Sequence, residues 1–160
     1  MTEEQKEKPE LIKKISKAEP IISIEETEEE KKLDDRTLKK SSKKYAQDNF
    51  QGKKYLNTDT GENILVSRDG IDKWEGKTKS REQAISIKKL DELLEKSKKA
   101  KSLPDKKGRE NIEGYNYYNS PIDVNKKPYN ANIAARKGEG DKLRYYYHFL
   151  KDREEKKEPS

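Results

Sequence analysis

Four side chains near the end of the chain have the types needed for acid–base chemistry on a phosphodiester. They are Arg136, Arg144, Tyr146 and His148, and His148 is the only histidine in the sequence. Metal-independent RNA cleavage needs a base for the 2′-hydroxyl proton, an acid for the leaving oxygen and cations for the phosphate. We expect His148 to act as base or acid, Tyr146 to orient or donate a proton, and the two arginines to stabilise the phosphate.

A predicted antiparallel pair of strands would bring these residues to one face. Residues 129–136 and 143–150 each alternate apolar with polar side chains. Burial of both apolar sets in one core predicts the pairs Ala135 with Leu143, Ile133 with Tyr145, Ala131 with Tyr147, and Tyr129 with Phe149. The other face then holds the polar set: Asn130, Asn132, Arg136, Arg144, Tyr146 and His148.

The same pattern has a plainer interpretation. One face of an antiparallel sheet in a Lys-rich protein is polar whether or not it has a function. Tyr145 and Tyr147 belong to the apolar set, so core packing explains them. Trp74 is expected to pack in the core, with base stacking as the alternative.

The rest of the sequence predicts the elements that would support this sheet. Residues 9–18 have the spacing of a short amphipathic helix, and residues 21–24 that of a strand. Asp34 or Asp35 can cap a helix with Leu38 on its apolar side. Residues 54–57 and 63–66 predict a hairpin around the turn at 58–62, and Ser67 can cap one helical turn.

A longer helix is predicted next, because apolar residues recur at helical spacing from Ala84 to Leu94, and the pattern ends before Pro104. Three antiparallel strands follow. We therefore expect an α+β fold, with N-terminal helices and a long central helix packed on a curved antiparallel sheet. Residues 10–151 would form a single domain, between charged tails at residues 1–9 and 152–160.

Composition excludes several classes of protein. The chain has 160 residues, of which 44% are charged and 28% hydrophobic, enough for one small core. With no cysteine and a single histidine, neither a thiolate nor a multi-histidine metal site is expected, and we expect no cofactor. No apolar run is long enough for a membrane span or a signal peptide, so a soluble cytoplasmic protein is expected, with no membrane partner.

Charge is unevenly distributed along the chain. Residues 1–35 hold ten Glu and two Asp against seven Lys, although the whole chain has a formal net charge of +6. The middle is therefore strongly basic and suited to a phosphate-rich partner. RNA or another nucleic acid is one candidate partner, and a phage or host protein is the other. The acidic segment could be solvated, could cover the basic body, or could itself mimic nucleic acid in an inhibitor.

Spaced motifs along the chain resemble a known group of domains. They are residues 15–22 (ISKAEPII), 57–73 (NTDTGENILVSRDGIDK), 121–124 (PIDV) and 144–150 (RYYYHFL), together with Tyr129 and Arg136. In this order they resemble the barnase/EndoU/colicin/RelE-like nuclease domains of phage and mobile-element polyvalent proteins. The resemblance covers roughly residues 10–151 and implies a metal-independent endoribonuclease. The alternative is a non-catalytic module that binds nucleic acid or protein with the same fold.

The resemblance also implies site residues. By position it implies Ser67, Lys73, Arg136, Tyr146 and His148. The predicted catalytic set is His148, Tyr146, Arg136 and Lys73. The predicted contacts to nucleic acid are Ser67, Arg68, Arg81, Asn130, Asn132 and Arg144.

Overall fold

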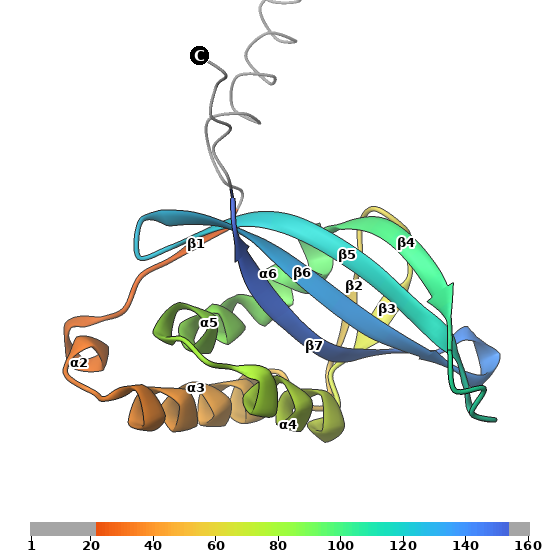
Figure 1. Ribbon diagram of the computed structural model, residues 1–160, viewed down its shortest axis with the longest axis horizontal. Coiled ribbons are helices and arrows are strands. Elements are labelled where there is room, and N and C mark those ends of the chain that lie inside the picture. The colour runs from red at the N-terminus through yellow and green to blue at the C-terminus, as the bar shows by residue number, and fades with distance from the viewer. Residues whose placement is uncertain (1–21, 154–160) are drawn as a thin grey trace, which may run out of the picture.

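A computed structural model describes residues 22–153, which form one seven-stranded sheet and a group of helices (Figure 1). The strands are β1 (Ile22–Ile24), β2 (Lys54–Leu56), β3 (Asn63–Leu65), β4 (Lys98–Pro104), β5 (Ile112–Val124), β6 (Lys127–Gly138) and β7 (Leu143–Asp152). The helices are α2 (Glu28–Lys31), α3 (Asp35–Asn49), α4 (Arg68–Lys77), α5 (Arg81–Ser86) and α6 (Leu90–Lys96), with 3₁₀ turns η1 (Ile87–Lys89) and η2 (Glu139–Asp141). The helix predicted for residues 9–18 lies outside the described residues.

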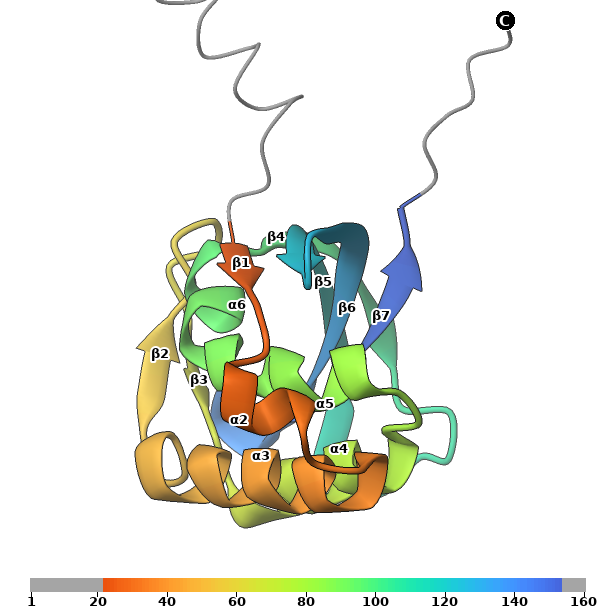
Figure 2. The same cartoon turned by 90° about the vertical axis from the view of Figure 1, so that its left-hand side faces the viewer.

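The sheet is mixed and curls around two of the helices. Its strand order is β1-β5-β6-β7-β3-β2, and β4 pairs with β5. The three long strands β5, β6 and β7 pair antiparallel with one another, but β1 runs parallel to β5 and β3 runs parallel to β7. Helices α5 and α6 lie between the sheet and α3, whereas α4 packs directly against β7 (Figures 1 and 2). The predicted α+β class with a curved antiparallel sheet is confirmed, and the β1–β5 and β3–β7 pairings add a parallel part to that sheet.

Local signals located several elements correctly. The Asp34 side chain caps α3 by accepting a hydrogen bond from the Thr37 amide at 2.8 Å, and Leu38 is fully buried on this helix. The β2–β3 hairpin forms as predicted, and Gly61 in its turn has φ +78°, a value that L side chains rarely adopt. Trp74 is fully buried, which confirms core packing.

The long central helix is a wrong prediction. The segment is instead α5, the 3₁₀ turn η1 and α6, which together bury Ala84, Ile87, Leu90 and Leu94. After α6 the chain forms β4, a strand whose residues are all exposed and which pairs with β5. Three lysines occupy this edge strand, a composition typical of sheet edges that resist further pairing. Its local sequence has no strand pattern. The pairing with β5 therefore determines its extended conformation.

The register between β6 and β7 also differs from the predicted one. Ala135 lies opposite Tyr145 and Ala134 opposite Tyr147. Tyr146 therefore has no residue opposite it on β6 and forms a β-bulge. Before the bulge the pairing is shifted by two residues from the prediction, and a shift of two keeps every side chain on its face. After the bulge the shift is three residues, which exchanges the faces. His148 is therefore fully buried, and Phe149 is 39% exposed.

Helix α4 crosses β7 at Gly70. A Cβ atom at this position would meet the backbone carbonyl oxygen of Tyr145, so the helix can approach the strand this closely only with glycine there. Gly76, in the same helix, has no heavy atom within 4 Å of the position of its missing Cβ. A side chain is therefore sterically excluded at Gly70 but has free space at Gly76.

Replacing Gly70 by Ala should lower the free energy of unfolding by about 1–3 kcal/mol, because the helix must move away from β7. Gly76→Ala is the matched control and should raise stability by about 0.5–1 kcal/mol through helix propensity alone. Urea unfolding monitored by Trp74 fluorescence measures both. Equal effects of the two substitutions would contradict the close approach of α4 to β7.

Candidate functional site

The face of the sheet that points away from the helices carries rows of aromatic and polar side chains. Its residues alternate with buried ones such as Tyr118 and Ile133, which lie in the core. We call this surface the outer face. It has three cross-strand rows: Leu103, Tyr115, Arg136 and Arg144; Lys101, Tyr117, Ala134 and Tyr147; and Asn119, Asn132 and Phe149.

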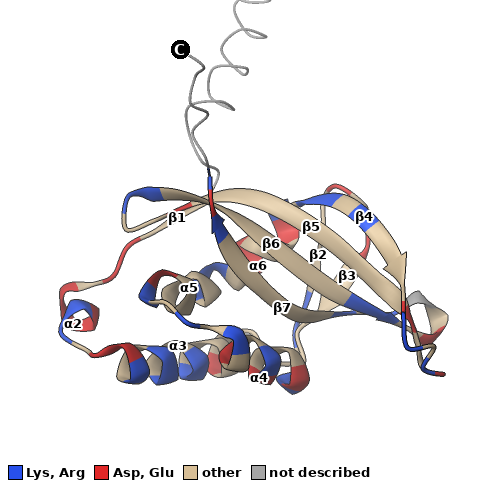
Figure 3. Ribbon diagram, viewed as in Figure 1, with Lys and Arg blue, Asp and Glu red and all other residues tan. Residues whose placement is uncertain are grey.

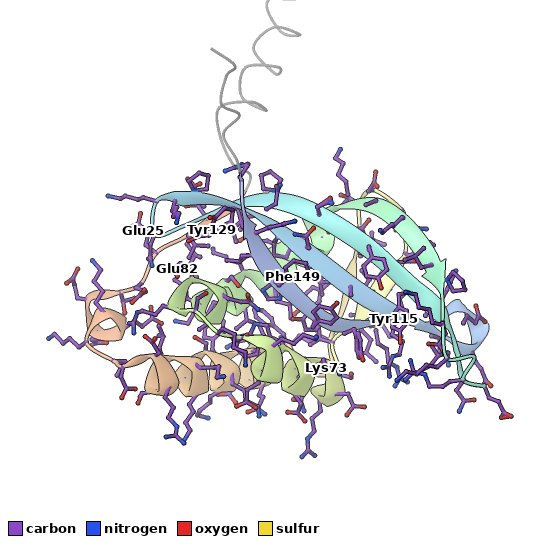
Figure 4. All side chains as sticks on the ribbon, viewed as in Figure 1. Glu25, Lys73, Glu82, Tyr115, Tyr129 and Phe149 are labelled. Carbon is purple, nitrogen blue, oxygen red and sulfur yellow. The ribbon has the colours of Figure 1, made fainter. Side chains whose placement is uncertain are left out.

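Tyr146 is at the centre of a cluster on this face. Its ring centre lies 5.3 Å from that of Tyr147 and 5.6 Å from that of Tyr115. The Arg136 guanidinium carbon lies 4.2 Å from the Tyr146 ring centre, and Lys73 Nζ lies 5.3 Å from it. Lys73 comes from α4, while Arg136 comes from β6 (Figure 4 labels Lys73 and Tyr115). One phenol ring is therefore in contact with two cations from different elements.

The two cations change the acidity of the phenol. Burial raises the pKa of Tyr146, but the Lys73 ammonium and the Arg136 guanidinium outweigh it, so the pKa is below the ordinary value of 10. For Tyr117 and Tyr147, burial together with neighbouring tyrosines raises the pKa instead. Of these three phenols, Tyr146 is therefore the one that most readily gives up or shares a proton.

Two more lysines lie over tyrosine rings of the outer face. Lys77 Nζ is 4.7 Å from the ring centre of Tyr147, and Lys101 Nζ is 5.7 Å from that of Tyr117. Lys73 and Lys77 are one helical turn apart on α4, so the same side of the helix faces both tyrosines.

Within residues 22–153, no carboxylate forms an ion pair with the lysines at positions 73, 77 and 101 or with Arg136. Their charges are therefore available to an anion. Arg144, opposite Arg136, adds a further exposed cation to this end of the sheet. Figure 3 shows Lys and Arg along α4 and where β6 and β7 run toward η2.

The outer face is hollowed between its aromatic side chains. The hollow has a volume of about 570 Å³. Ala134 lies in it, between Tyr117 on β5 and Tyr147 on β7, and Lys101 of β4 lies at its border. Asn119, Asn132 and Phe149 also line it, and Phe149 is seen on β7 in Figure 4. Aromatic rings, amides and a cation thus border one open space.

His148 is not part of this face, contrary to the predicted grouping. It is fully buried on the helix side of the sheet, with Nε2 2.8 Å from Ser86 Oγ and Nδ1 2.7 Å from the Tyr145 hydroxyl. Ser86 donates its own proton to the Gln83 carbonyl, so its oxygen accepts from Nε2–H, and Nδ1 accepts from Tyr145. Burial lowers the pKa of His148 to about 3. Both ring nitrogens are satisfied inside the core, and the imidazole is neutral.

Arg81 also lies away from the outer face. Its guanidinium donates to Glu26 Oε1 at 2.7 Å and to Asp35 Oδ1 at 2.9 Å, and to the backbone carbonyls of Leu33 and Glu30. These bonds fasten the segment around α2 to the start of α5. Hydrogen bonds to the two carboxylates raise the pKa of Arg81 above its ordinary value. The predicted contact to nucleic acid is therefore a fully engaged structural arginine.

The other predicted residues are divided between two places. Ser67 occupies the N-cap position of α4, but its side chain makes no capping hydrogen bond there. Arg68 pairs with Asp72 in the same helix at 3.7 Å. The outer face holds the remaining six: Lys73, Asn130, Asn132, Arg136, Arg144 and Tyr146.

Sequence reasoning missed five residues of this face: Lys77, Lys101, Tyr115, Tyr117 and Tyr147. The i, i+2 spacing of Tyr115 and Tyr117 would have placed both on one face of a strand, and the i, i+4 spacing of Lys73 and Lys77 would have placed both on one side of a helix. No comparable signal exists for Tyr147, because its outward position follows from the bulge.

Two further findings concern residues 22–153. No group of three or more His, Cys, Asp and Glu side chains in this part of the chain could hold a metal ion. No helix in the same range is long and apolar enough to cross a membrane.

The buried imidazole should make stability depend on pH. His148 takes up a proton near pH 6.5 when unfolded but only near pH 3 when folded, so its stabilising effect is complete above pH 6.5 and is lost as the pH falls toward 3. Between pH 7 and pH 5 we expect a loss of about 2 kcal/mol in the free energy of unfolding from this group. Urea unfolding at the two pH values measures it.

His148→Gln is the comparison for this measurement. The variant retains every carboxylate, so the difference between the two pH dependences isolates the histidine. The same pH dependence in both proteins would contradict a neutral buried imidazole. Because the chain has one histidine, its imidazole NMR signals are assigned without ambiguity and should not titrate between pH 7 and pH 5.

Comparison with known proteins supplies the family. Residues 33–146 match the family model described as large polyvalent protein-associated domain 3, while no curated protein and no solved structure matches the chain. The match confirms the expected link to polyvalent proteins and supports an origin in a phage or mobile element; it does not extend to the barnase, EndoU or colicin nucleases. Since this family model covers well over half of the sequence, the chain belongs to the family of large polyvalent protein-associated domain 3.

Proposed function

We propose that this domain binds single-stranded nucleic acid on its outer face, with RNA as the first candidate. The observation that carries the proposal is the set of cations that lie over the rings of Tyr117, Tyr146 and Tyr147 without a carboxylate partner in the described part of the chain. Aromatic rings bind base faces by stacking, and nearby Lys and Arg bind the phosphates that connect the bases.

The arrangement favours a single strand over a duplex. In a duplex the faces of the bases are covered by their neighbours, so rings on a sheet can stack only on bases that are splayed out. The tyrosines of this site lie in one rigid sheet on the two strands that flank β6, at positions 115 and 117 of β5 and 146 and 147 of β7. The basic middle of the sequence supports the same choice of partner.

Replacing Arg136 by Gln should weaken binding of a fluorescein-labelled oligouridylate and reduce its dependence on salt. Loss of one phosphate contact should make the slope of log K against log salt less steep by about 0.7 for a single strand. Fluorescence anisotropy over a series of salt concentrations measures both quantities, and labelled oligodeoxythymidylate and a hairpin duplex provide the comparison with DNA and with paired bases.

Arg36→Gln is the matched control, because Arg36 is an exposed arginine of α3 and its loss changes the net charge equally. It should leave the salt slope unchanged. If Arg136→Gln and Arg36→Gln have the same small effect, binding depends on overall charge and not on the outer face. If neither single strand binds more tightly than the duplex, stacking on the tyrosines is excluded.

A second candidate, cleavage of the bound RNA, is favoured by the lowered pKa of Tyr146. As a phenolate, Tyr146 would take the proton of a ribose 2′-hydroxyl, and the 2′-oxygen would attack the adjacent phosphorus. The 5′-oxygen would leave with a proton from Lys73, giving a 2′,3′-cyclic phosphate, while Arg136 stabilises the charge on the phosphate. The proton carrier in this scheme is Tyr146, because both ring nitrogens of His148 are bonded within the core.

Incubation of the protein with total RNA in EDTA should then yield fragments that end in 2′,3′-cyclic phosphate. Tyr146→Phe removes the titrating hydroxyl and keeps the ring, so it should lower the cleavage rate by at least the factor of about 100 typical of a general base. Tyr45→Phe is the control, because Tyr45 is an exposed tyrosine of α3 outside the outer face, and it should cut normally. Cleavage that survives Tyr146→Phe would exclude this mechanism, and absence of cleavage by all three proteins would leave binding alone.

A further inference from the structure

We infer that the hollow of the outer face holds one unstacked nucleobase, inserted between Tyr117 and Tyr147, with Asn119 and Asn132 against its edge. The inference rests on the proposed binding of single-stranded nucleic acid. It adds a defined subsite to that surface, separate from the cluster around Tyr146.

The walls and floor of the hollow have the dimensions for a flat ring. Tyr117, Ala134 and Tyr147 lie opposite one another on three adjacent strands. Two strand spacings separate the tyrosines at the backbone, about 10 Å in total, and the Ala134 methyl group between them leaves the space above it open. The hollow has a volume of about 570 Å³, which is large enough for a purine or a pyrimidine base.

The next row along the sheet supplies polar groups. Asn119 and Asn132 lie directly opposite each other on β5 and β6, and both line the hollow. Asn132 donates to the Asn130 carbonyl at 3.4 Å, which leaves its Oδ1 to accept, while the Asn119 side chain is exposed. An amide presents a donor and an acceptor side by side, the combination that matches the edge of a base.

Charge distinguishes a nucleotide from an aromatic side chain of a protein partner. Among the described residues that line the hollow, Lys101 is the only charged one and none is acidic. Lys101 lies over one wall of the hollow and Lys77 over the other, at 5.7 Å and 4.7 Å from the two ring centres. A base in a chain has a phosphate on each side of its sugar, and two cations on opposite walls are placed for two such phosphates.

Filling the hollow tests the inference directly. Ala134→Leu adds bulk to the floor and leaves every cation in place. Affinity is measured by fluorescence anisotropy with labelled oligouridylate, with oligoadenylate and with an abasic strand of the same length, which has the phosphates and no bases. Ala134→Leu should weaken binding of the two base-containing strands about tenfold, the value of one stacked base, and leave abasic binding unchanged. Unchanged affinity for all three strands would overturn the inference.

A second variant keeps the test decisive if Ala134→Leu alters the fold, which urea unfolding would reveal. Asn119 is exposed, and within residues 22–153 its side chain has no hydrogen-bond partner, so Asn119→Ala should fold as the wild type does. It should change the ratio of affinities for oligouridylate and oligoadenylate by about tenfold, without affecting the abasic strand. An unchanged ratio would contradict the assigned role of the amide.

The outcomes separate the inference from the function on which it rests. If the wild type binds none of the three strands, the proposed function is wrong. If the wild type binds the abasic strand as tightly as the others, phosphate binding stands and the base subsite is overturned.

Discussion

The arrangement of both faces of this domain depends on the β-bulge at Tyr146. One extra residue in β7 reverses the alternation of side chains beyond it. Tyr145 and His148 point into the core on either side of the bulge, whereas Tyr146 and Tyr147 both lie on the outer face, with ring centres 5.3 Å apart. A regular strand would have placed the imidazole among the outer residues and Phe149 in the core.

The hydrogen bonds of His148 make the inward half of this arrangement stable. A buried imidazole is costly unless both nitrogens have partners, and Tyr145 and Ser86 supply them. Gln83 adds a bond from its side chain to the His148 backbone carbonyl at 3.1 Å. The end of α5 is thereby tied to the strand just after the bulge. The hydrogen bonds that hold His148 in the core therefore also fix the position of the bulge, which places Tyr146 and Tyr147 on the outer face.

The helices complete the outer face from the side. Gly70 allows α4 to lie against β7, and the lysines of this helix then reach the rings of Tyr146 and Tyr147. Arg81 performs a comparable task elsewhere, since it joins the segment around α2 to α5 through two carboxylates and two carbonyls. Some cations of this Lys-rich chain thus hold the fold together, while within residues 22–153 those over the rings of Tyr117, Tyr146 and Tyr147 form no ion pair with a carboxylate.

The sequence by itself determined the α+β class, the capped helix after Asp34, the β2–β3 hairpin and the presence of Arg136 and Tyr146 on one face. These follow from local spacing and capping, which act within a few residues. Only the tertiary structure decided the pairing of β4, the break in the central helix, and the exchange of His148 with Phe149. The physical reason is that a strand edge, a bulge and a buried imidazole are stabilised by partners distant in the sequence, such as Ser86 for His148.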